Sequence, residues 1–197
     1  MCSLEAAGLV DTLDDNEQRR KFEGLVRPHL AAALSLARWL TGNATDAEDV
    51  AQDAAVRAFR SVDTVQDSSA KAWLLSITRN TAFTWLAKNR PKTLLVTEDE
   101  KVFEQAEALM FSEPQNATAE TEMIARADAE LLRREISALP IAYREVLVLR
   151  EIEGMNYREI GALLAIPVGT VMSRLSRARA LLIANINTIQ PQEKKRK

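Results

Sequence analysis

Apolar side chains recur every three or four residues over most of the chain, which is the spacing of helices with one buried face. Residues 18–90 carry three runs of this kind. The first is rich in leucine and ends at Gly42. The second opens where Thr45 and Glu48 have the spacing of a capping box. The third covers about Ala70–Asn89 and stops before a proline, so this region is predicted to be three helices.

The remaining pattern separates a second helical region from the first. Residues 92–122 lose the helical period and carry eight acids, so we expect a flexible linker there. Helical spacing resumes near Thr121, and after a turn the last helix begins near Thr170. Because no segment alternates as a strand does, the predicted fold is all-α: two small helical domains, at residues 18–91 and 123–190, joined by the flexible acidic linker.

The net charge of −2, from 26 basic and 28 acidic residues, argues at first against a nucleic-acid partner. Its distribution along the chain changes that picture. Residues 92–122 have a net charge of −6, whereas residues 123–197 have a net charge of +5. Residues 68–97 and 160–192 contain several Lys or Arg and no acid, as binding to a phosphate backbone requires locally. For either stretch alone, the alternative is chance clustering.

Few residues have the chemistry of a catalytic or metal site. Cys2 is the only cysteine and His29 the only histidine, so neither an internal disulfide nor a Cys/His zinc site can form. The sequence has no Gly-rich phosphate loop, no apolar run of the roughly 20 residues that span a membrane, and no signal-peptide pattern. We therefore expect a cytoplasmic protein without membrane insertion, cofactor or metal, and not an enzyme.

The last two predicted helices have the pattern of a helix-turn-helix. Asn156 and Glu159 have the spacing of a cap at the start of the first of these helices. Gly161 is a small residue at a position where two crossing helices would need to approach closely. The predicted core positions of the second helix are Val171, Leu175, Ala178 and Leu182. Its other face carries only hydroxyl and guanidinium groups, from Thr170, Ser173, Arg174 and Arg177, with Arg179 beside them. Such groups bind bases and phosphates in the major groove, which predicts duplex DNA binding; the alternative is an ordinary surface helix.

This region resembles the −35-reading domain of extracytoplasmic-function (ECF) sigma factors. The residues that carry the resemblance are Leu139–Pro140, Tyr143–Arg150, Glu153–Gly161 and Pro167–Arg179. The resemblance implies that the hydroxyl and guanidinium face lies at or near the −35 element of a promoter. Met172 stands where many members carry a basic residue, which bears on promoter preference.

An acidic strip lies along the second N-terminal helix. Its members are Asp46, Asp49, Gln52 and Asp53. The strip would complement a basic partner helix, and the alternative is a solvated face with favourable acids at the helix start. Residues Asp46–Asp53, followed by Arg57–Phe59, resemble the ECF segment that docks on the β′ clamp helices of RNA polymerase, and this motif includes Glu48.

The third N-terminal helix combines basic and aromatic side chains. Its basic residues are Lys71, Arg79, Lys88 and Arg90, and its aromatic residues are Trp73, Phe83 and Trp85. Basic groups pair with phosphates and rings stack on bases, which predicts binding to single-stranded DNA. Aromatic residues at helical spacing are more often core, as we expect for Trp73. Residues Ala72–Asn80 resemble the −10-reading segment of ECF sigma factors, which adds Asn80 to the −10 candidates, whereas Thr84 departs from the family pattern.

The resemblance covers roughly residues 20–90 and 125–183 and implies a sigma factor. Such a subunit binds core RNA polymerase, through the β′ clamp helices and the β flap, and directs it to the −10 and −35 elements of promoter DNA without catalysis of its own. An anti-sigma factor is a further implied partner. Two other hypotheses remain: a helix-turn-helix regulator that binds duplex DNA without polymerase, and an interaction protein that holds polymerase without initiating transcription.

Overall fold

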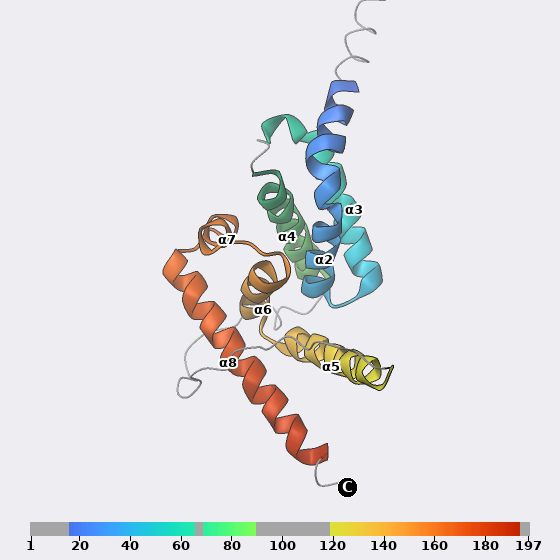
Figure 1. Cartoon of the computed structure of the whole chain (residues 1–197). Coiled ribbons are helices and arrows are strands. Elements are labelled where there is room, and N and C mark those ends of the chain that lie inside the picture. Colours follow the sequence, from blue (N-terminus) through green and yellow to red (C-terminus); the bar gives the residue numbers. More distant parts are fainter. Residues whose placement is uncertain (1–15, 66–68, 90–118, 194–197) are drawn as a thin grey trace, which may run out of the picture.

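Helices form the fold (Figure 1). The computed structural model describes residues 16–65, 69–89 and 119–193, and no strand occurs in these ranges, as predicted. The helices are α2 (Leu30–Thr41), α3 (Ala44–Arg60) and α4 (Ala70–Asn89) in the N-terminal lobe, and α5 (Ala119–Ala138), α6 (Ile141–Leu147), α7 (Tyr157–Leu164) and α8 (Val168–Glu193) in the C-terminal lobe. Shorter helical turns are η1 (Phe22–Val26), η2 (Arg27–His29), η3 (Val62–Thr64) and η6 (Val148–Ile152). Arg90, Cys2 and predicted linker residues 92–118 lie outside the described residues.

Capping residues fix the helix boundaries of the N-terminal lobe. α2 ends where Gly42 takes a φ of 70°, a conformation that glycine adopts without steric cost. The side-chain oxygen of Asn43 accepts hydrogen bonds from the backbone N–H groups of Thr45 and Asp46, at 2.8 and 3.3 Å. Asn43 is therefore the N-cap of α3, and the predicted cap at Thr45 is wrong. Asn43 is a strong capping residue that comes first in the chain, so Thr45 falls inside the first helical turn.

The core of the N-terminal lobe lies between α2, α3 and α4. Leu36, Leu40 and Leu74 are each at most 1% exposed. The inner face of α3 consists of the buried residues Ala47, Val50, Ala54 and Ala58. Alanine at these positions lets the neighbouring helices approach α3 closely. Trp73 and Ile77 are half-buried against a second apolar cluster, so the expected packing role of Trp73 is confirmed.

In the C-terminal lobe, α7 and α8 form the predicted helix-turn-helix. Asn156 and Glu159 make a reciprocal capping box at the start of α7, as predicted. Ala165 ends α7 with a φ of 54°. α8 then begins at Val168, before the predicted start at Thr170. The predicted start is too late because the first buried apolar residue of α8 is Val171, which lies after the first three residues of the helix. α5 likewise begins at Ala119, inside the predicted linker.

Gly161 lies where α7 meets the start of α8. A Cβ atom added to Gly161 would stand 3.0 Å from the carbonyl oxygen of Ile166 and 3.6 Å from a methyl carbon of Val168. We expect Gly161→Val to lower the free energy of unfolding by about 1–3 kcal/mol, because the added carbons must displace backbone. Chemical denaturation followed by circular dichroism measures this change.

The control position for Gly161 is Gly169, where an added Cβ atom would have no other atom within 4 Å. Because alanine favours a helix over glycine, Gly169→Ala should leave stability unchanged or raise the free energy of unfolding by about 0.5–1 kcal/mol. If Gly161→Val were as stable as the wild type, the crossing of α7 and α8 would not require glycine.

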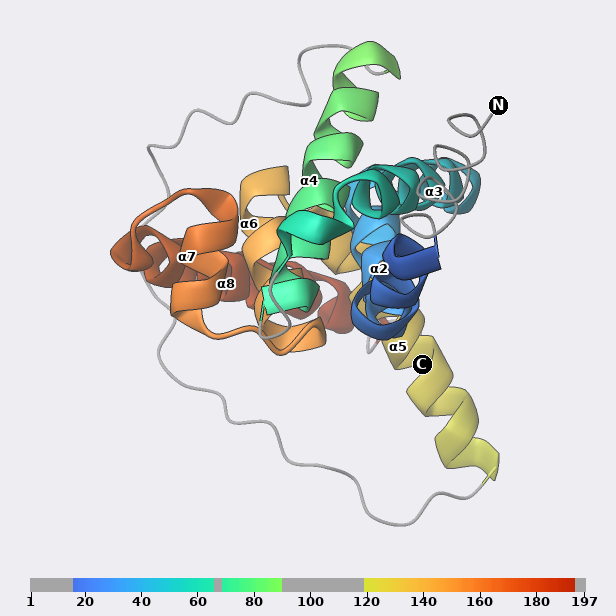
Figure 2. The ribbon, with the colours of Figure 1, turned by 90° about the horizontal axis from the view of Figure 1, so that it is seen from above.

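The two lobes pack against each other (Figure 2). α2 contacts α6, and α4 contacts α7. Buried residues of both lobes belong to one apolar cluster, which includes Leu36 and Leu75 from the N-terminal lobe and Val146 from the C-terminal lobe. Arg144 in α6 also donates a hydrogen bond to the carbonyl oxygen of Trp39 in α2, at 3.0 Å. We call this arrangement the closed form.

Candidate nucleic-acid interface

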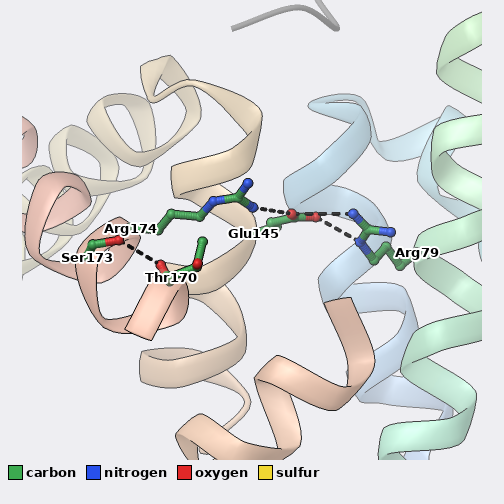
Figure 3. Close-up of polar contacts among 5 residues, drawn as sticks. All are labelled: Arg79, Glu145, Thr170, Ser173 and Arg174. Carbon is green, nitrogen blue, oxygen red and sulfur yellow. Dashed lines mark hydrogen bonds and ion pairs between the residues drawn. The ribbon is translucent and has the colours of Figure 1, made fainter. Parts of the chain in front are cut away.

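α8 presents the predicted DNA-binding face unevenly. Its core side is buried, since Val171, Leu175 and Ala178 are each at most 1% exposed. Ser173 and Arg179 are exposed, whereas Thr170, Arg174 and Arg177 are half-buried. The hydroxyl of Ser173 donates to the backbone carbonyl of Thr170 at 3.0 Å (Figure 3). The five predicted residues therefore lie together on α8, but part of this face turns toward the rest of the protein.

Each arginine of this face has a partner within the protein. Arg174 Nη1 lies 3.7 Å from a carboxylate oxygen of Glu145 in α6 (Figure 3). Arg177 Nη1 donates to the hydroxyl of Tyr143, at 3.5 Å. Arg179 forms a 2.6 Å ion pair with Glu151 in which both side chains are about half exposed. The first two partners lie on α6, so α6 lies beside the inner flank of the predicted DNA-binding face.

The outer flank of α8 carries exposed residues that are not among the five predicted DNA-binding residues. Met172 is 54% exposed, Val168, one turn earlier, is 40% exposed, and Ser176 is also exposed. The signal was present in the sequence, because Met172 and Ser176 are off the apolar stripe defined by Val171 and Leu175. The accessible surface of α8 therefore carries hydroxyl, apolar and basic groups side by side.

α4 carries the predicted −10 residues, which the structure separates into two groups. Asn80 and Lys88 are exposed, and Arg90 lies outside the described residues. Lys71 and Arg79 are half-buried and bind the C-terminal lobe. Lys71 Nζ donates to the carbonyl oxygen of Glu153 at 2.6 Å and lies 3.3 Å from its carboxylate. The guanidinium of Arg79 stacks on the Phe83 ring, 4.6 Å from its centroid.

Glu145 links the two predicted DNA-binding helices. Arg79 Nε donates to Glu145 Oε2 at 2.9 Å, and Arg174 approaches Oε1 from the other side (Figure 3). The side chain of Glu145 is only 3% exposed. Burial raises the pKa of Glu145, and the hydrogen bond and charge of Arg79, with the charge of Arg174, oppose that rise.

Sequence reasoning missed Glu145 because its partners are far away in the chain. The one available signal was its position on α6. Glu145 lies three and four residues before the buried Val148 and Leu149, so it shares the buried face of that helix. A buried carboxylate requires a cationic partner, but the spacing does not say which one.

The acidic strip on α3 is accessible, as a docking surface requires. Glu48, Asp49, Gln52 and Asp53 are exposed, and Asp46 is half-buried in the first helical turn. Asp53 pairs with Arg57 at 3.0 Å and Glu48 lies 3.8 Å from Arg38, and these exposed ion pairs contribute little stability.

An exposed apolar residue follows this strip on the same side of α3. Val56 is 48% exposed and stands seven residues after Asp49 and three after Asp53, so it shares their side of α3. Val56 is not among the predicted docking residues, although its helical spacing from Asp49 and Asp53 is visible in the sequence. The surface therefore has an exposed apolar residue at the C-terminal end of the acidic strip.

The described ranges contain neither a metal cluster nor a single membrane-spanning helix. No group of three or more His, Cys, Asp or Glu side chains in these ranges could hold a metal ion. No single helix there is long and apolar enough to cross a membrane. α7 and residues 168–186 of α8 reach that length and composition only as a pair bent by 102°.

Two family descriptions and several curated proteins match this chain. Residues 25–92, which include α2–α4, match Sigma-70 region 2, and residues 129–182, which include α6 and α7, match Sigma-70, region 4. The ECF RNA polymerase sigma-E factor of Escherichia coli K12 is 31% identical over 93% of this chain and 93% of its own length. The RNA polymerase sigma-H factor of Pseudomonas aeruginosa is 36% identical over 82% of this chain and 83% of its own length.

A further relative is longer than this chain. The ECF RNA polymerase sigma factor SigE of Mycolicibacterium smegmatis is 33% identical over 87% of this chain, and the match spans 64% of the relative's length. Two solved structures have a similar fold. CnrH in complex with the cytosolic domain of CnrY has a TM-score of 0.61 and 26% identity over 92% of this chain and 97% of its own. The sigma factor RpoE in complex with the anti-sigma factor NepR from Bartonella quintana has a TM-score of 0.59 and 25% identity, over 81% of this chain and 92% of its own.

Proposed function

Because the chain belongs to the ECF RNA polymerase sigma factors, a family of transcription initiation proteins, we propose that it is a promoter-specificity subunit of RNA polymerase. The observation that carries this proposal is the combination of two surfaces in one chain. An exposed acidic strip on α3 suits a basic protein partner, and a helix-turn-helix with a basic, hydroxyl-rich face suits duplex DNA. In this function the polymerase catalyses transcription, and the chain has no catalytic role.

The two DNA-reading roles fall on different lobes. α8 reads the −35 element through Thr170, Ser173, Arg174, Arg177 and Arg179. α4 reads the −10 element through Lys71, Arg79, Asn80, Lys88 and Arg90. Arginine suits guanine edges and hydroxyl groups suit bases or phosphates, which supports the first assignment. The stacking of Arg79 on Phe83 supports the second, because basic and aromatic groups together suit melted DNA.

The acidic strip on α3 and a solved structure of a relative support two proposed protein partners, core polymerase and an anti-sigma factor. The strip, with Val56 at its C-terminal end, docks on the β′ clamp helices of core polymerase, and the C-terminal lobe contacts the β flap. An exposed apolar residue beside charged groups is typical of docking surfaces, which supports this role for α3. RpoE of Bartonella quintana is in complex with an anti-sigma factor, and we propose that this chain also binds a partner of that class. We propose further that this chain acts in the cytoplasm, together with the polymerase.

Binding assays with and without polymerase test this function against its two rivals. A sigma factor should bind core polymerase and shift promoter DNA only weakly on its own. Tight, sequence-specific binding of duplex DNA by the chain alone, without any affinity for core polymerase, would favour a helix-turn-helix regulator. Binding to core polymerase without promoter recognition would favour an interaction protein.

Met172 gives a prediction about the promoter bases. Its exposed side chain on the outer flank of α8 suits contact with the methyl group of a thymine. Replacing that thymine by deoxyuridine, which lacks the methyl, should weaken binding of the holoenzyme three- to fourfold, because one buried carbon contributes about 0.8 kcal/mol. Met172→Ala should lose this sensitivity, whereas Leu132→Ala, an exposed apolar control on α5, should keep it. Equal binding to every substituted promoter would contradict a methyl contact.

A further inference from the structure

Two of the proposed −35 arginines have partners inside their own lobe. Arg174 Nη1 lies 3.7 Å from Glu145 Oε1 (Figure 3). Arg177 Nη1 donates to the hydroxyl of Tyr143 at 3.5 Å. Both partners belong to α6, and α6 packs directly on α8. These two contacts therefore lie entirely within the C-terminal lobe and require no residue of the N-terminal lobe.

The two partners are fixed in place, whereas the arginines reach the surface. The side chain of Glu145 is 3% exposed, and Tyr143 is 7% exposed. Val146 and Leu147, their neighbours on α6, are also buried, so this helix is held on more than one side. The side chain of Arg174 is 26% exposed, and Arg177 is half-buried. Each arginine thus has a buried partner behind it and still borders solvent.

This arrangement restricts side chains that are otherwise flexible. An arginine loses much rotamer freedom when it binds a base edge, and a partner that restricts it beforehand removes part of that cost. We propose that Glu145 and Tyr143 are positioning residues for −35 recognition: they hold the guanidinium groups of Arg174 and Arg177 in orientations from which each reads a base. This inference deepens the proposed function and rests on it.

Base reading depends on orientation more than phosphate binding does. A guanidinium that binds guanine must align two N–H groups with O6 and N7, whereas a phosphate accepts hydrogen bonds from many directions. Loss of a positioning residue should therefore reduce discrimination between bases. A residue that served only packing would instead reduce binding to all sequences alike.

Glu145 has a second partner, which the test must separate from Arg174. Arg79 Nε, from α4, donates to Glu145 Oε2 at 2.9 Å, and Arg174 approaches the carboxylate from the other side (Figure 3). If Glu145 served only to bind Arg79, its loss would have no effect in an Arg79→Ala chain. If Glu145 positions Arg174, the effect should persist in that chain and vanish in an Arg174→Ala chain.

Glu145→Gln in the holoenzyme tests the proposal, because it removes the charge and keeps the size of the side chain. The promoters differ only at the −35 base pair whose discrimination is lost in Arg174→Ala. Discrimination at this base pair should fall about two- to tenfold, the range expected when one flexible side chain is no longer held. A ratio of affinities cancels the uniform effect of removing a negative charge. Glu130→Gln, at an exposed acid of α5, is the matched control and should leave the ratio unchanged.

Tyr143→Phe gives an independent test at the other arginine, because it removes only the hydroxyl. Discrimination at the base pair that Arg177 reads should fall about twofold, as expected for one long, neutral hydrogen bond. Discrimination at the base pair of Arg174 should not change. In an Arg177→Ala chain, Tyr143→Phe should have no further effect.

Three results would overturn the inference. The first is full base discrimination in Glu145→Gln. The second is an equal loss at every −35 position in either α6 variant, which would be a packing defect. The third is an effect of Glu145→Gln that persists in the Arg174→Ala chain. Full discrimination by Arg174→Ala itself, or a wild-type holoenzyme that does not distinguish −35 sequences, would instead contradict the proposed function, so the two failures are distinguishable.

Discussion

A chain with Asp49→Lys and Asp53→Lys should bind core polymerase about 2–5 kcal/mol more weakly than the wild type. Both carboxylates are exposed on α3, on the side that carries Val56. Reversal of their charge would place like charges against the basic partner helix that we propose. The loss should shrink as salt is added, because mobile ions screen these charges. Titration of labelled core polymerase with each chain gives the dissociation constants.

The matched control for this variant changes the same number of charges elsewhere. Glu17→Lys and Glu130→Lys together alter exposed acids outside α3. This chain should bind core polymerase as the wild type does. If both double variants lost affinity equally, the acidic strip would matter only through net charge, and specific docking through α3 would be contradicted.

Arg174→Ala and Arg177→Ala should each weaken binding of the holoenzyme to its promoter by about 1–3 kcal/mol if the arginine reads a base. The loss should then disappear on promoters in which the contacted base pair has been changed. An arginine that binds phosphate would instead weaken binding to all sequences and lower the salt dependence by about one counterion. Competition binding with a set of single-base promoter variants separates these outcomes.

Arg133→Ala is the control for the two arginine variants, because Arg133 is exposed on α5, away from the predicted DNA-binding face. It should leave promoter affinity unchanged. Wild-type promoter affinity in the Arg174 and Arg177 variants would exclude this face of α8 from −35 recognition. The outer flank around Met172 and Ser176 would then be the remaining candidate surface of α8.

Local signals predicted most of the helices. The sequence placed α4 at Ala70–Asn89 because a proline follows it, and placed the start of α7 because Asn156 and Glu159 have capping-box spacing. The errors were also local. Asn43 and Thr45 are both good capping residues, and spacing alone did not show which of them caps α3. The start of α8 was missed because its first turn carries no buried residue before Val171.

The closed form could not be predicted from the sequence. Arg79 and Glu145 are 66 residues apart, and Lys71 and Glu153 are 82 apart. Helical periodicity indicates which side of one helix is buried, but it carries no information about which helix covers that side. The sequence therefore singled out the basic side chains of α4 and α8 as candidates, while the carboxylate of Glu145 that Arg79 and Arg174 share became visible only in three dimensions.

Run-off transcription with purified core polymerase decides whether the chain is a sigma factor. Core polymerase, the chain and fragmented genomic DNA of the same organism are combined, and transcript 5′ ends are mapped. We predict transcripts with defined start sites that share upstream −35 and −10 sequences, and we predict that they disappear when the chain is omitted or carries Asp49→Lys and Asp53→Lys. Binding of the chain to core polymerase without any defined start site would contradict the proposed function.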